Sequence, residues 1–150
     1  MGVTAKKAAL RFLKIRPRSV AELKEKLEQK GFDSVQIETA VGDLTAMGLL
    51  DDRAFTKAFI NYRLARPFGF RRIVLELNAK GIDPGIIEEA IAQARETCNP
   101  QEVALDLAQR RWHHIPSGVD ALKKKKRVMD FLLRRGFDTD VVMKVIKQLK

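Results

Sequence analysis

The chain of 150 residues is 45% hydrophobic and 32% charged, with a formal net charge of +10. This composition excludes wholesale disorder, and the single cysteine, Cys98, excludes an internal disulfide. No apolar run reaches the roughly 18 residues that cross a bilayer, and the first residues lack the apolar core of a signal peptide. We therefore expect a cytoplasmic protein without a membrane partner. Its charge predicts an anionic partner, with a role in solubility alone as the alternative.

The beginning of the chain predicts three helices. Apolar residues between positions 5 and 13 have the spacing of a helix that ends before Pro17. Ser19 and Glu22 are three residues apart, as in a capping box, and we expect them to start the second helix. A glycine turn at Gly31 then leads into the third helix.

The middle of the chain predicts the same order of helices. We expect Asp52 to cap a helix that stops near Pro67. Gly69 then stands at the position that corresponds to Ser19, where the second helix begins. These correspondences indicate a tandem duplication of one helical unit.

The glycine turn in this second unit is the best-defined feature of the sequence. Gly81 is expected just after a helix end with a left-handed backbone, where a Cβ atom costs roughly 1–2 kcal/mol. Ile82 can then fold back on Leu77, and Asp83 caps the next helix. The same pattern surrounds two other glycines, Gly31 and Gly136.

The last part of the chain completes a third unit. Asn99 predicts a helix start, this helix ends around residues 113–116, and Ser117 with Asp120 restarts the chain. No segment alternates as a strand would, so the predicted fold class is all-α. We expect three tandem three-helix repeats, about nine helices, that form an elongated, curved body. The repeats are assigned to residues 1–50, 51–98 and 99–150.

Four segments resemble the RecX family, regulators of the RecA recombinase. They read RPRSVAELKEKLEQKGF, AVGDLTAMGLLDDRAF, GFRRIVLELNAKGI and KKKKRVMDFLLRRGFDTDVV, and their order and spacing match over residues 8–149. The resemblance implies an all-helical monomer of three-helix repeats that binds the RecA–DNA filament. It further implies inhibition of the ATPase, strand-exchange and coprotease activities of RecA in recombinational repair and the SOS response, without chemistry or a cofactor of its own.

The first group of candidate contact residues surrounds Gly69. Arg71 and Arg72 lie in the first turn of a predicted helix, at the positive end of its dipole, where cations are slightly unfavourable. Such a placement favours an anionic partner, although a solvated face is the alternative. Arg63 and Arg66 join this group if the chain folds back at Pro67.

Two further groups of cations complete the candidates. In the third repeat, Lys123, Lys126 and Arg127 share one face of a predicted helix, while Lys124 falls at the position of a helix cap. In the first repeat, three cations surround Pro17 in a loop, and these are Lys14, Arg16 and Arg18. For both groups a solvated surface remains the alternative.

The residue types argue against sequence-specific DNA reading and against catalysis. The helices after each glycine turn carry acidic or apolar residues where a recognition helix would carry Arg, Asn or Gln. Tyr62 and Trp112 are expected in the core, with base stacking as the alternative. We find no zinc-ligand spacing and no nucleophile–base arrangement, so we predict no metal and no enzyme activity. Binding to single- or double-stranded DNA without sequence preference remains the alternative function.

Overall fold

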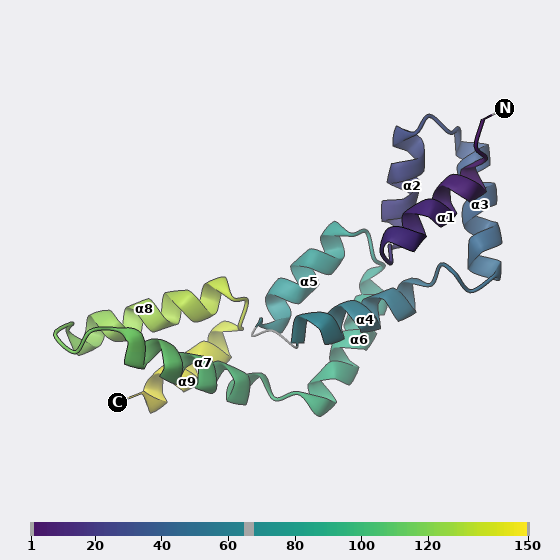
Figure 1. Ribbon diagram of the computed structural model, residues 1–150. Helices are drawn as coiled ribbons and strands as arrows, with labels where there is room; N and C mark the ends of the chain where they lie inside the picture. The colour runs from purple at the N-terminus through teal and green to yellow at the C-terminus, as the bar shows by residue number, and fades with distance from the viewer. Residues whose placement is uncertain (1, 65–67, 150) are drawn as a thin grey trace. The chain divides into compact units, whose positions relative to one another are not determined.

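The computed structural model describes residues 2–64 and 68–149, and these residues form nine α-helices and no strand (Figure 1). The prediction of an all-α fold of three-helix repeats is therefore confirmed. None of the described helices is long and apolar enough to span a bilayer. The helices are α1 (Ala5–Ile15), α2 (Val20–Gln29), α3 (Ser34–Ala46), α4 (Asp52–Leu64), α5 (Phe70–Ala79), α6 (Pro84–Thr97), α7 (Pro100–His114), α8 (Ala121–Arg134) and α9 (Thr139–Gln148).

Contacts divide the chain into two compact units. Unit 1 comprises Met1–Phe59 and Leu77–Ala90, and unit 2 comprises Ile60–Glu76 and Ile91–Lys150. The second repeat is therefore shared, since α4, α5 and α6 each contribute to both units. This division follows from where the glycine turns pack, as described below. It does not coincide with the repeat boundaries at residues 50 and 98, which remain a prediction.

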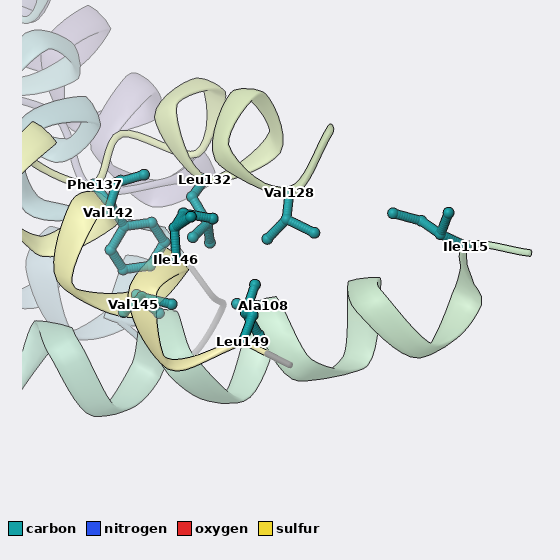
Figure 2. Close-up of a cluster of buried hydrophobic side chains, with 10 residues drawn as sticks. Ala108, Ile115, Val128, Leu132, Phe137, Val142, Val145, Ile146 and Leu149 are labelled. Atoms are coloured by element: carbon teal, nitrogen blue, oxygen red, sulfur yellow. The ribbon is translucent and has the colours of Figure 1, made fainter. Parts of the chain in front are cut away.

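Each of the outer repeats has its own hydrophobic core. In unit 1, α1 packs on α2 and α3, and small side chains such as Ala9 let the helices approach Leu23 and Leu44. In unit 2, α7, α8 and α9 pack together, and Figure 2 shows Val128 and Leu132 of α8 pointing toward side chains of the other two helices. Burial of these apolar faces is the main stabilising term for such short helices.

All three predicted glycine turns are present. Gly81 has a φ of 74°, in the left-handed region, and the N–H of Ile82 donates to the Leu77 carbonyl at 3.3 Å. The Gly81 N–H donates to the Asn78 carbonyl at 3.0 Å, which completes the Schellman pattern. The other two turns have the same hydrogen bonds and φ values of 92° and 90°, at Gly31 and Gly136.

Two predicted helix starts differ from the structure. Asp51, not Asp52, caps α4, because its carboxylate accepts hydrogen bonds from the backbone N–H groups of Arg53 and Ala54 at 3.0 and 3.2 Å. In the third repeat, α8 begins directly after Asp120, so Ser117 is not its cap. Where several Asp or Ser residues precede a helix, the sequence alone does not show which of them is the N-cap. Tertiary packing decides where the helix begins and therefore which residue caps it.

Gly81→Ala is expected to lower the free energy of unfolding by about 1 kcal/mol or more, since the new Cβ would occupy a left-handed backbone. That atom would also lie 2.5 Å from the Cβ of Ala21. Gly42→Ala in α3 is the matched control, because a Cβ there meets nothing within 4 Å and a helix interior favours alanine by about 0.5–1 kcal/mol. Urea unfolding of both variants tests the turn, and equal effects would contradict it.

Candidate functional site

The turn between α5 and α6 packs on the start of α2, and we call this contact the first junction. The Ser19 hydroxyl is fully buried and donates to the backbone carbonyl of Lys80 at 2.7 Å. The same oxygen accepts from the N–H of Glu22 at 3.1 Å, as the N-cap of α2. One side chain therefore satisfies a donor at one helix start and an acceptor at another helix end, neither of which has a partner within its own helix.

Asp52 also belongs to the first junction. Its Oδ1 accepts a hydrogen bond from the N–H of Val20 at 2.9 Å, so a carboxylate from α4 caps the first turn of α2. The negative charge lies at the positive end of the α2 dipole, where it is favourable. The prediction that Asp52 caps its own helix is wrong because its side chain is used across the junction.

Charged side chains converge on one carboxylate at the first junction. The Oε2 atom of Glu22 lies 2.8 Å from the Nη2 of Arg16 and 3.5 Å from the Nζ of Lys80. The Lys80 ammonium also lies 5.9 and 5.5 Å from the ring centroids of Phe55 and Phe59. Two cations thus share one carboxylate.

Burial and neighbouring charges change two ionisation equilibria here. Burial alone raises the pKa of Glu22, but the hydrogen bonds from Arg16 and the Ser19 N–H, with the charge of Lys80, lower this pKa below its usual value. Burial lowers the pKa of Arg18, and the nearby charge of Arg16 lowers it further. The Arg18 guanidinium lies 5.4 Å from the Phe12 ring centroid and donates to the Phe12 carbonyl at 3.3 Å.

The turn between α8 and α9 makes an equivalent contact with the start of α5, which we call the second junction. The Gly69 N–H donates to the Arg135 carbonyl at 2.8 Å, and the Arg71 N–H donates to the Gly136 carbonyl at 3.1 Å. A Cβ at Gly69 would clash with the backbone of Gly136, so only glycine permits this approach. Backbone donors at Gly69 thus replace the hydroxyl that Ser19 supplies at the first junction.

Three guanidinium groups surround one aromatic ring at the second junction. The guanidinium carbons of Arg63, Arg72 and Arg135 lie 5.2, 4.4 and 5.3 Å from the ring centroid of Phe68. Glu76 is the shared carboxylate, with its oxygens 2.7 Å from the Nε of Arg63 and 3.3 Å from the Nε of Arg72. We call these five residues the arginine cluster, which has an excess of positive charge.

In the structure, some of the predicted contact residues form ion pairs or ring contacts within the chain, and others are exposed. Arg63 and Arg72 are brought together as predicted, and both are held by Glu76. Arg71 is exposed beside them in the first turn of α5, while Arg66 lies outside the described residues. In unit 1, Arg16 and Arg18 have the partners described above, and Lys14 is exposed in the last turn of α1.

The cations of the third repeat form a separate patch. Lys123, Lys126 and Arg127 are exposed in the first half of α8. Arg135 follows Arg127 by eight residues, a distance of about 12 Å along a helix axis. Lys124 is not at a helix cap, because α8 begins at Ala121, and its Nζ lies 4.2 Å from the ring centroid of Trp112.

Sequence reasoning missed several residues of the two junctions. Arg135, Phe68 and Glu76 were not predicted as members of a common cluster. Only the correspondence between Ser19 and Gly69 could have indicated that the turn between α8 and α9 packs on the start of α5. Tyr62 was expected in the core but is 55% exposed, because α4 turns this side outward. Trp112 is partly buried against the core of the third repeat, in agreement with its prediction.

Comparison with known proteins agrees with this architecture. Models of the first, second and third three-helix domains of RecX match residues 5–44, 51–91 and 99–146. The chain is 35% identical over 140 residues to the regulatory protein RecX of Chlorobaculum tepidum, covering 93% of this chain and 84% of that protein. It is 36% identical over 143 residues to RecX of Thermus thermophilus, covering 95% and 90%.

The chain belongs to the RecX family of regulatory proteins. Its fold is also similar to the crystal structure of RecX from Lactobacillus salivarius, with a TM-score of 0.86 and 24% identity. That match covers 97% of this chain and 94% of that chain, and at this identity it shows the fold. The RecX resemblance noted in the sequence is therefore confirmed.

In this RecX-family chain, Ser19→Ala is expected to lower the free energy of unfolding by about 2 kcal/mol, since it leaves a buried donor and a buried acceptor unpaired. Thr4→Ala is the matched control, because Thr4 caps α1 through one exposed hydrogen bond at 3.2 Å. The control should cost about 0.5–1 kcal/mol. Denaturant unfolding compares the two, and an equal loss would mean that the hydroxyl does not couple the repeats.

Glu22→Gln is expected to make stability less dependent on pH. The folded pKa of Glu22 is lowered, so its ionisation stabilises the fold above the unfolded pKa of about 4.3 and this contribution is lost as pH falls through the folded value. The variant should lose about 1–2 kcal/mol at pH 7 and less at pH 3. Urea unfolding at both values checks this, and a deficit that does not change with pH would contradict the ion-pair account.

Proposed function

We propose that this chain binds the RecA–DNA filament and restrains its recombinase, ATPase and coprotease activities in recombinational repair and the SOS response. Membership of the RecX family supports a regulatory role. The observation that carries the proposal is the arginine cluster, where three guanidinium groups surround the Phe68 ring and one carboxylate, that of Glu76, pairs with two of them, beside the exposed Arg71. This excess of positive charge suits an anionic surface such as a nucleoprotein filament.

The proposed contact surface contains residues of two kinds. Arg71, Lys123, Lys126 and Arg127 are exposed and can reach a partner without breaking a described ion pair. The second kind of residue already makes contacts within a junction, so a contact with the partner would be an additional role. These residues are Arg16, Arg18, Arg63 and Arg72. Lys14 and Arg66 complete the residues that we propose for the contact.

Repetition gives this mode of binding a physical advantage. The two junctions are built from corresponding elements, and each presents cations around a glycine turn. Two weak contacts on one chain reinforce each other, because the first raises the effective concentration of the second. Such a chain would oppose a filament by holding neighbouring subunits, and no chemical step is needed.

A second candidate function is nucleic-acid binding without sequence preference. Tyr62 favours this alternative, because the residue is 55% exposed and the Arg63 guanidinium lies 6.0 Å from the centroid of its ring. An exposed aromatic ring beside a cation is suited to stacking on a base next to a phosphate. About five phosphate contacts to a single strand would give a log–log salt slope of about −3.5.

ATP hydrolysis by RecA on single-stranded DNA distinguishes the two functions. Filament binding predicts inhibition well below the amount of protein that saturates the DNA. The Arg71→Glu variant, and separately a variant with Lys123, Lys126 and Arg127 reversed, should each raise the half-inhibitory concentration roughly tenfold, equivalent to about 1.4 kcal/mol. Because Arg71 makes no described ion pair and lies at the positive end of the α5 dipole, its reversal to Glu should not lower the thermal unfolding temperature.

The control is the double variant Lys144→Glu and Lys147→Glu, whose side chains are exposed in the second half of α9. It reverses two charges outside the proposed surface, so inhibition should remain. Inhibition that appears only when the protein can coat the DNA would favour nucleic-acid binding. An equal loss in the control would show that net charge, and not the proposed surface, is responsible.

A further inference from the structure

An open groove of about 460 Å³ lies in unit 1, between α1 and the turn that joins α2 to α3. Its apolar lining is formed by Val3, Ala8, Phe12, Ile15 and Phe32. Ligand grooves in proteins have this size and are lined mostly by apolar side chains with a few polar groups. The two polar groups of this groove are both cations, Arg11 and Lys30.

The groove exists because α1 presents small side chains to its neighbours. Ala8 is buried and lines the groove, so a larger residue at this position would fill part of it. The apolar surface around it is not covered by the described chain. Ile15 is 75% exposed and Val3 is 41% exposed, and Val35, beside a second hollow that shares Val3 and Phe32, is 72% exposed.

The charged residues that line the groove itself are both positive, while acidic residues lie nearby at Asp33, which follows Phe32, and at Asp43 in the second hollow. Residues 2–18 contain six cations and no acidic residue. Arg16 is paired with Glu22, but four others form no ion pair with any described residue, and these are Lys6, Lys7, Arg11 and Lys14. An apolar groove lined by Arg11 and Lys30, with unpaired cations along α1, favours binding of a ligand that is apolar at its centre and acidic at its edges.

We propose that this groove binds an acidic segment of a partner protein through one apolar anchor residue. The anchor would pack between Phe12, Ile15 and Phe32, and flanking carboxylates would meet Arg11 and Lys30. The exposed aliphatic side chains of Val3 and Ile15 favour an apolar anchor residue over a base. Phe12 and Phe32 with the two cations would also suit a single strand, so an oligonucleotide is included in the test below. The proposal concerns a surface that shares Phe12 with the surroundings of Arg18 but otherwise uses residues outside both junctions, and it does not depend on RecA as the partner.

Selection from a displayed library of random peptides, with the full chain immobilised, tests the groove. We expect enriched peptides to combine Asp or Glu with a leucine, isoleucine, methionine or phenylalanine anchor. The Arg11→Glu and Lys30→Glu double variant should weaken their binding at least tenfold. Ala8→Phe should do the same by filling the groove while leaving every charge in place.

Two further variants separate loss of the groove from misfolding and from a change in net charge. Ile15→Ser removes an exposed apolar wall without touching the core, so it tests the anchor even where Ala8→Phe does not fold, and it should also weaken binding at least tenfold. The double variant Lys144→Glu and Lys147→Glu changes net charge by the same amount as the double variant at the groove, and it should bind the peptides normally.

Three results would overturn the proposal. A library that yields no acidic, apolar peptides would exclude this ligand class. Selected peptides that bind Ile15→Ser and Ala8→Phe as well as the native chain would show that the groove is not used. A single-stranded oligonucleotide could also compete with the peptides for binding. If Ile15→Ser and Ala8→Phe each weakened the binding of that oligonucleotide tenfold, the groove would be assigned to nucleic acid.

Discussion

The left-handed glycine turn is the constraint on which the two junctions depend. It ends a helix abruptly and leaves one carbonyl, that of Lys80 or Arg135, pointing outside the helix. That carbonyl is an acceptor without an intrahelical partner, and the start of a helix in the preceding repeat supplies the missing donor. Since the donor is a hydroxyl at Ser19 and a backbone N–H at Gly69, the same connection is achieved by two chemistries.

The same turns also concentrate positive charge. Lys80 and Arg135 occupy the helix ends whose carbonyls form the junctions, and cations are favoured there by the helix dipole. The Lys80 ammonium lies near the rings of Phe55 and Phe59 and shares Glu22 with Arg16 of the preceding repeat. The Arg135 guanidinium joins Arg63 and Arg72 of the preceding repeat around Phe68. Architecture and a cationic surface are thus consequences of one local structure. One carboxylate at each place, Glu22 or Glu76, pairs with two of the cations.

Two neighbouring cations of α5 differ in whether the fold already uses their charge. Arg72 is tied to Glu76 and Phe68, so its charge is partly used within the fold, whereas Arg71 is exposed in the same helix turn. The groove of the first repeat differs from both junctions, because its lining is apolar and its cations form no ion pairs with the described chain. A regulator built in this way can present chemically different surfaces on repeats of one fold.

The sequence alone determined the helices, the three turns and the family, because caps and apolar spacing depend on residues within a few positions of one another. It also indicated where cations gather, although it did not reveal that Arg135 belongs with Arg63 and Arg72. Only the tertiary structure decided that Asp52 caps α2, that Tyr62 is exposed and that Ala8 leaves a groove. These features depend on packing between segments distant in the chain, and a local pattern contains no information about which segments meet.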